Sequence, residues 1–132
     1  MHGPDPSTRE DPQLRKFQKE LSAGTVSLAL LAVVEAAGEP VYGYQIAKTL
    51  ERFGEGVLSG KQSALYPVLR NLGAAGLLDS HVEPSVSGPP RRYYRITEAG
   101  RATLRTWTAA WIATRNSVDA VLKGTTTAWS AP

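Results

Sequence analysis

The stretch from Leu58 to Thr97 constrains the fold of this 132-residue chain more than any other part. It opens with Leu65, Leu69 and Leu72, whose spacing of four and three residues predicts a helix with one apolar stripe. Gly76 predicts the end of that helix, and a short strand follows it. A loop rich in proline, glycine and serine then leads to a second strand. This order of elements is typical of the recognition helix and wing of a winged helix-turn-helix.

The predicted recognition helix presents a polar face. Ser59 and Gln62 have capping-box spacing, so we expect the helix to begin there. Pro67 would cost about 3 kcal/mol inside a helix, but the leucine stripe continues past it, so we expect the helix to continue as well. With the leucines turned inward, the outward side chains are Lys61, Gln62, Ser63, Tyr66 and Arg70. Such side chains pair with base edges or phosphate oxygens, which predicts a DNA-binding face.

Two adjacent arginines, Arg91 and Arg92, stand beside the proline-glycine loop, just before a strand expected from Tyr93 to Ile96. Alternation along this strand assigns Tyr94 and Ile96 to the core. We interpret the two arginines as phosphate contacts of the wing. The alternative is that they only protect an edge hairpin from aggregation.

Positive charge is concentrated in the same part of the chain. The formal net charge is +3, from 15 lysines and arginines against 12 aspartates and glutamates. Residues 59–105 hold seven of these basic residues and three of the acidic ones, a balance of +4, so the remainder sums to −1. A positive central segment fits an anionic partner such as double-stranded DNA. A solvated charged surface is the alternative.

The chain ahead of this stretch predicts helices. Residues 1–11 are polar and proline-rich, and we expect them to be disordered. A short helix is predicted from Pro12 to about Ser22, with Asp11 as its cap. A second, apolar helix is predicted from Val26 to Ala37, with Thr25 as its cap.

A third helix is predicted beyond Gly38, with Ile46, Ala47 and Leu50 on its apolar face. The most apolar run of the chain, Val26 to Val34, is far shorter than the roughly 20 residues that cross a bilayer. The start of the chain lacks the apolar region of a signal peptide, and there is no cysteine. We therefore expect a cytoplasmic protein without a membrane partner.

A long last helix, capped by Thr97, is predicted over residues 98–123. Its apolar and small positions recur at spacings of 3, 4, 3, 4 and 3, at Leu104, Trp107, Trp111, Thr114, Val118 and Val121. A stripe this narrow is typical of contact with a partner helix, and we expect the same helix of a second copy. Residues 124–132 show no pattern and are predicted to be a disordered tail.

These elements predict a mainly α fold with a small β-hairpin. Residues 12–97 would form the winged helix-turn-helix domain, and residues 98–123 a C-terminal dimerisation helix. A homodimer would present two recognition helices to one pseudo-palindromic DNA site.

Four segments in this order resemble the PadR family of bacterial transcriptional regulators. They are VYGYQI at 41–46, LYPVLRNL at 65–72, AGLL at 75–78 and GPPRRYYRITEAG at 88–100. The resemblance implies a homodimeric, sequence-specific repressor that a small effector releases from DNA. The chain departs from the family where Gly73 and Ala74 replace the usual charged pair, and its last helix lacks the extension of larger members.

Some short members of that family bind drug-like aromatic compounds through a tryptophan of the last helix. Trp111 falls at that position, and Trp107 lies one turn earlier. By this resemblance Leu104, Trp107, Trp111 and Val118 would line a pocket for a planar aromatic effector. The alternative is that these side chains only fill the dimer interface.

Other functional classes have less support. The two histidines are His2 and His81, and no glycine-rich phosphate loop is present, so we expect neither an enzyme nor a cofactor. Asp79, His81 and Glu83 alternate as a solvent-facing strand side does, and we expect no metal there. The main alternative is a winged helix that serves as a protein-interaction module and does not bind DNA.

Overall fold

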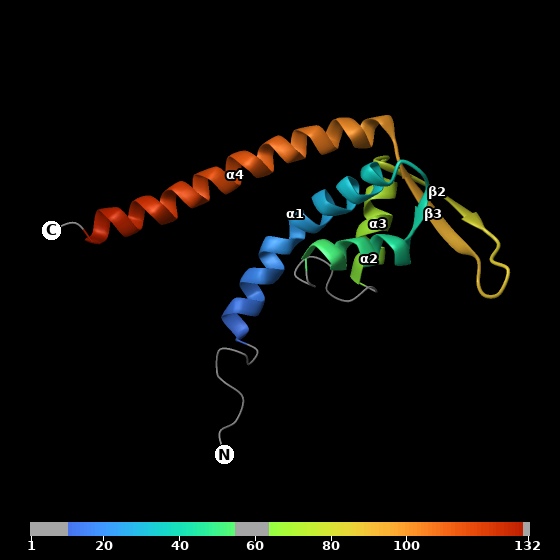
Figure 1. The fold of residues 1–132 in the computed structure, drawn as a ribbon, viewed down its shortest axis with the longest axis horizontal. Helices are drawn as coiled ribbons and strands as arrows, with labels where there is room; N and C mark the ends of the chain where they lie inside the picture. The colour runs from blue at the N-terminus through green and yellow to red at the C-terminus, as the bar shows by residue number, and fades with distance from the viewer. Residues whose placement is uncertain (1–10, 55–63, 131–132) are drawn as a thin grey trace, which may run out of the picture.

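A computed structural model describes residues 11–54 and 64–130, and the following account refers to these residues. Three helices and a small sheet form a compact head, and the last helix extends away from it (Figure 1). The elements are α1 (Pro12–Ala37), β1 (Val41–Tyr42), α2 (Gly43–Gly54), α3 (Leu65–Ala74), β2 (Leu78–Glu83), β3 (Arg91–Ile96) and α4 (Glu98–Ser130). The predicted class, a mainly helical winged helix-turn-helix with a long C-terminal helix, is confirmed.

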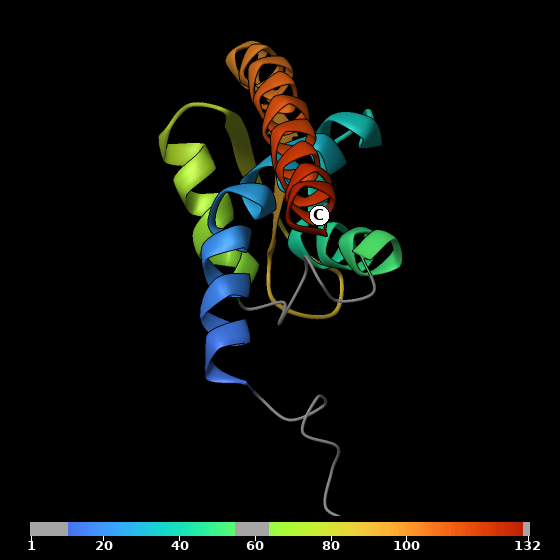
Figure 2. The same cartoon turned by 90° about the vertical axis from the view of Figure 1, so that its left-hand side faces the viewer.

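One hydrophobic core joins the three helices of the head to the sheet. Its buried members are Leu30, Leu31, Val34, Ile46, Ala47, Leu50, Leu65, Leu69, Leu72, Leu78, Tyr94 and Ile96. The predicted leucine stripe of α3 and the predicted inward side of β3 are thereby confirmed. Viewed along α4, α2 and α3 flank α1, so α1 supplies the centre of the core (Figure 2).

The predicted pair of N-terminal helices is a single helix, α1. Thr25 is not a cap, because its hydroxyl donates to the carbonyl oxygen of Leu21 at 2.9 Å, a contact made inside a continuous helix. The predicted ends are correct. The Asp11 side chain accepts a hydrogen bond from the Gln13 N–H at 2.9 Å, and Gly38 closes the helix with a φ of 70°.

By length and composition, α1 is also the one helix in the described part of the chain that could cross a membrane. Its apolar stretch, however, includes Leu30, Leu31 and Val34, which are buried in the core of the head. The core helix of a soluble protein has the same composition, so this is weak support for a membrane span.

The sheet has three strands in the order β1-β3-β2, where the sequence predicted a two-stranded hairpin. Val41 pairs with Tyr94 and Tyr42 with Tyr93 in an antiparallel ladder. A strand of two residues is too short for the alternation that predicts strands, which is why no strand is expected at β1 from the sequence. Gln45 accepts a hydrogen bond from the Tyr42 N–H at 3.0 Å, which links β1 to the start of α2.

The helix continues through Pro67, as predicted: Pro67 is the third residue of α3, which is described from Leu65. The first turn of a helix has no intrahelical acceptor for its N–H groups, and a proline there costs little. The predicted capping box at Ser59 and Gln62 lies outside the described residues, as do Lys61 and Ser63.

The last helix begins as predicted and ends later. Thr97 caps α4, since its hydroxyl oxygen accepts from the Gly100 N–H at 2.9 Å. Helix geometry then continues to Ser130, so the predicted disordered tail is wrong at residues 124–130. Gly124 weakens a helix by only about 1 kcal/mol, and no proline follows before Pro132. Thr125 further ties the added turns back through a hydrogen bond to the Val121 carbonyl oxygen.

The first turn of α4 is pressed against the turn that follows α3. The Thr97 N–H donates to the Leu77 carbonyl oxygen at 3.1 Å, and the Thr97 hydroxyl donates to the Gly76 carbonyl oxygen at 2.7 Å. Gly100 is buried there, and a Cβ built on it would lie 2.1 Å from the Leu77 carbonyl oxygen. Only glycine leaves room for this contact.

We therefore expect Gly100→Ala to lower the free energy of unfolding by about 1–3 kcal/mol, because the added methyl overpacks a backbone contact. Gly124→Ala is the matched control, since a Cβ on Gly124 meets nothing within 4 Å. That change should raise stability by about 0.5–1 kcal/mol, as alanine does inside a helix. Urea unfolding followed by circular dichroism measures both values, and equal effects of the two changes would refute the close packing at Gly100.

Candidate nucleic-acid interface

The structure brings Arg70 of α3 and Arg92 of β3 to the two sides of one cleft. This cleft, about 470 Å³ in volume, separates α3 from the wing. Its lining residues are Leu69, Arg70, Gly73, Leu78, Asp79, Ser80, Arg92 and Tyr94. Both arginines are exposed. One cation from the predicted recognition helix and one from the wing are thus available to the same ligand.

The cleft fixes part of its own geometry. Arg92 donates a hydrogen bond to the Ser80 hydroxyl oxygen at 2.9 Å, so its guanidinium is held over the strand pair β2–β3. Tyr94 is buried beside it, and burial raises the pKa of its phenol above the ordinary 10.0. The Arg92 charge opposes that rise, Tyr66 adds to it and Arg70 opposes it. All three side chains therefore lie close enough to influence the Tyr94 hydroxyl.

Tyr66 belongs to the same surface. It lies in the first turn of α3 and is 39% exposed, while Leu65 and Leu69 on either side are buried. The Tyr66 ring lies against Gly43, the first residue of α2. Of the predicted DNA-binding face, Tyr66 and Arg70 lie among the described residues, and both are exposed. The other predicted members, Lys61, Gln62 and Ser63, lie outside the described residues.

Arg91 lies apart from Arg92. Both residues are part of β3, which begins two residues earlier than predicted, and adjacent strand residues point to opposite faces of a sheet. The Arg91 guanidinium carbon sits 4.6 Å from the centre of the Tyr42 ring, on the face away from the cleft. This cation–π contact accounts for Arg91 without a phosphate. The two guanidinium groups thus lie on opposite faces of the sheet.

The face of the sheet that carries Arg91 also holds Asp79, His81 and Glu83, where no metal is expected from the sequence. His81 Nε2 lies 3.1 Å from Glu83 Oε1, and the His81 ring stacks on Tyr93 with centroids 5.7 Å apart. Asp79 pairs with Arg95 across the strands at 3.5 Å. In residues 11–54 and 64–130 no three His, Cys, Asp or Glu side chains are grouped so that they could hold a metal ion.

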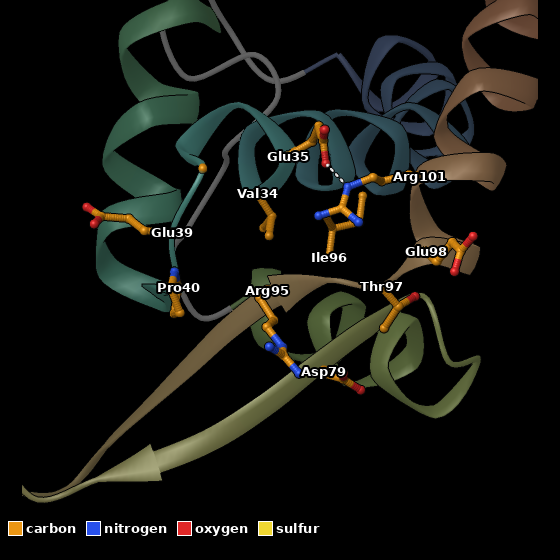
Figure 3. A pocket seen from close by; sticks show the side chains of 11 residues that line it. Val34, Glu35, Glu39, Pro40, Asp79, Arg95, Ile96, Thr97, Glu98 and Arg101 are labelled. Atoms are coloured by element: carbon orange, nitrogen blue, oxygen red, sulfur yellow. Dashed lines mark hydrogen bonds and ion pairs between the residues drawn. The ribbon is translucent and has the colours of Figure 1, made fainter.

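A second cavity, of about 540 Å³, lies where the end of α1 meets β3 and the first turn of α4 (Figure 3). It contains charges of both signs. Arg101 is paired with Glu35 at 3.0 Å, and Arg95 with Asp79. The carboxylates of Glu39 and Glu98 also line it, so acids outnumber arginines. Such a lining repels a polyanion, and this cavity is therefore not part of the nucleic-acid interface.

The residues predicted to form the apolar stripe of α4 differ in burial. Leu104 and Trp107 pack against the core of their own chain, whereas Trp111 is 37% and Val118 50% exposed. A groove of about 480 Å³ runs between α1 and α4 beside both tryptophans. Its lining residues are Glu20, Leu21, Gly24, Thr25, Ser27, Leu28, Trp107, Ala110, Trp111 and Thr114. The structure thus brings Trp107 and Trp111 together at one groove and leaves Val118 outside it.

Comparison with known proteins agrees with this geometry. Residues 30–106 match the transcriptional regulator PadR-like family. The chain is 38% identical over 91 residues to the transcriptional regulator Rv3488 of Mycobacterium tuberculosis (strain ATCC 25618 / H37Rv), which covers 69% of this chain and 76% of that protein.

Two crystal structures are similar as well. A PadR family transcriptional regulator from Eggerthella lenta DSM 2243 is 33% identical, with a TM-score of 0.70 over 83% of this chain and 91% of that one. A PadR-like transcriptional regulator from Bacillus cereus strain ATCC 14579 is 25% identical, with a TM-score of 0.64 over 78% and 96%. With its recognition helix, its wing and the match over residues 30–106, this chain belongs to the PadR-like family of transcriptional regulators.

Proposed function

We propose that this transcriptional regulator is a cytoplasmic, sequence-specific DNA-binding repressor that acts as a homodimer and is released by a small molecule. The observation that carries the DNA-binding part is the cleft between α3 and the wing, with Arg70 on one side and Arg92 on the other. Membership in the PadR-like family supports the regulatory role. Repression and release by an effector rest on the resemblance of the sequence to that family.

In this proposal α3 enters the major groove with Tyr66 and Arg70 outward, and Arg92 contacts the flanking backbone. Arginine pairs with guanine or with phosphate, and a tyrosine hydroxyl binds phosphate oxygens. Lys61, Gln62 and Ser63 would extend the same face toward the start of the helix. Arg91 contributes least, because its guanidinium already lies over the Tyr42 ring.

The dimer is proposed to form through α1 and α4. The N-terminal half of α1 exposes Leu14, Phe17 and Leu21, and the C-terminal half of α4 exposes Val118 and Val121. The two halves diverge, so neither covers the other within one chain (Figure 1). A second copy related by a two-fold axis would bury both apolar surfaces and place two α3 helices on the same side.

The groove beside Trp107 and Trp111 is the candidate effector site. Two indole rings and Leu28 supply apolar surface for a flat ligand, and Glu20 adds one carboxylate at the groove. A planar aromatic cation fits this chemistry best. The competing interpretation, in which the partner's helix fills the groove completely, is open to the same experiments.

The DNA-binding proposal predicts a steep fall of affinity with salt concentration, measured by fluorescence anisotropy on a nonspecific duplex. Arg70→Ala and Arg92→Ala should each make the slope of log affinity against log salt shallower by about 1, because each removes one phosphate contact. Arg95→Ala is the matched control, since Arg95 lies on the other face of β3 and pairs with Asp79. Its slope should equal that of the unmodified protein.

Arg91→Ala tests the placement of that residue, and we expect its slope to stay close to that of the Arg95→Ala control. A slope as shallow as that of Arg92→Ala would show that Arg91 leaves Tyr42 to contact DNA. If the unmodified protein binds no duplex even at low salt, DNA binding is refuted, and the protein-interaction module takes its place.

The dimer proposal predicts that Trp111→Ala shifts the protein toward the monomer in analytical ultracentrifugation, because it removes a large apolar ring from the interface. Ile112→Ala is the control, as Ile112 is similarly exposed, at 42%, but lies one residue outside the stripe. A sedimentation profile unchanged by Trp111→Ala would exclude the ring from the interface.

The effector-site proposal predicts that proflavine, a planar aromatic cation, quenches tryptophan fluorescence in the unmodified protein and quenches it less in Trp111→Phe.

A further inference from the structure

Gly43 and Tyr66 make an unusually close contact between α2 and α3. Gly43 is the first residue of α2 and is buried. A Cβ built on Gly43 would lie 2.6 Å from Cε1 of the Tyr66 ring and 3.3 Å from both Cζ and the hydroxyl oxygen. The hydroxyl end of the Tyr66 ring therefore rests directly on the α-carbon of Gly43.

This glycine is needed for space and not for its backbone conformation. Positive φ angles occur among the described glycines at Gly38, Gly76 and Gly88, and Gly43 is not one of them. Its backbone is helical, which alanine favours. The three heavy atoms nearest to a Cβ built on Gly43 all belong to the Tyr66 side chain. Substitution of Gly43 by alanine therefore acts first on the position available to Tyr66.

The position of the Tyr66 ring matters for binding because one side of the ring contacts buried Gly43 while the residue is still 39% exposed. Leu65 and Leu69 hold the first turn of α3 in the core, whereas Tyr66 is exposed. An exposed tyrosine on a helix usually samples several rotamers, and contact with a flat backbone surface restricts it to one. A side chain that is ordered before binding loses less entropy when the ligand arrives.

We propose that Gly43 is a positioning residue for DNA recognition: it leaves room for the Tyr66 ring to lie on the first turn of α2, next to the exposed face of α3 that also carries Arg70. The inference rests on the proposed function, in which Tyr66 contacts DNA. It adds a residue of α2 to the interface that touches no DNA in this proposal and acts through Tyr66 alone.

A double-mutant cycle tests this coupling. Gly43→Ala should weaken binding to the nonspecific duplex of the salt titration, at low salt, by about tenfold, the loss expected when one contact is displaced. In a Tyr66→Ala background the same change should cause no further loss, because the ring that it displaces is gone. Gly124→Ala, which adds a methyl to a helix where nothing lies within 4 Å, is the control and should bind as the unmodified protein does.

Thermal unfolding supplies a second readout that does not depend on DNA. Gly43→Ala should lower the melting temperature in the unmodified background, since the methyl and the ring compete for one space. In the Tyr66→Ala background it should leave the melting temperature unchanged or raise it. If Gly43→Ala alone fails to fold, rescue of folding by Tyr66→Ala still demonstrates the contact.

Four results would overturn the inference. Gly43→Ala with unchanged affinity would show that Tyr66 needs no support from α2. An equal loss in both backgrounds would show that Gly43 acts independently of Tyr66. Tyr66→Ala with unchanged affinity, in a protein that does bind duplex, would remove Tyr66 from the interface and leave the proposed function standing. Absence of duplex binding by the unmodified protein would refute both.

Discussion

The burial of one leucine stripe decides how this molecule can meet a ligand. Leu65, Leu69 and Leu72 are nearly inaccessible to solvent and fix the rotation of α3 about its own axis. Because a helix has two sides, fixing the inward one determines the outward one. Tyr66 and Arg70 are exposed for that reason, and the cleft with Arg92 exists because Leu78 and Tyr94 pack on the same stripe. The interface is thus a consequence of the core.

Helix α4 is connected by hydrogen bonds to the end of α3, which carries the leucine stripe. Leu77 follows α3, and its N–H donates to the Leu72 carbonyl oxygen at 3.0 Å. The Leu77 carbonyl oxygen in turn accepts from Thr97 at the start of α4, and Arg101 ties that first turn to Glu35 of α1. The end of the recognition helix and the beginning of α4 therefore share one set of hydrogen bonds. The two helices are therefore connected through backbone hydrogen bonds as well as through the core.

The parts of the fold that sequence patterns predicted are those set by local chemistry. Asp11, Gly38 and Thr97 act at helix ends, and their capping chemistry depends on neighbours within four residues. Strand β1 escaped prediction because two residues have no periodicity, and its partner Tyr94 lies far along the chain. The break expected near Thr25 was wrong because threonine is also accommodated inside helices, where its hydroxyl bonds to the preceding turn.

At the candidate site, the sequence predicts which residue types are present but not the face of the sheet to which each side chain points. Arg91 and Arg92 were grouped as neighbours, and strand alternation places them on opposite faces. That separation was readable from the sequence once the strand was extended to Arg91. The contact between Gly43 and Tyr66 was not readable, since it joins two helices whose relative placement only tertiary packing determines.

The length of α4 has a geometric consequence for a dimer joined through it. A helix of 33 residues rises about 1.5 Å per residue and is therefore about 50 Å long. A tilt of about 5° where α4 meets the head would displace the head by about 4 Å relative to the far end of such a helix. Half-sites on DNA are spaced by a helical turn of about 34–36 Å, so a displacement of about 4 Å is roughly a tenth of that spacing. In the proposed dimer, a small bend of α4 near Gly100 would therefore alter the separation of the two α3 helices and with it the operator spacings that they can span.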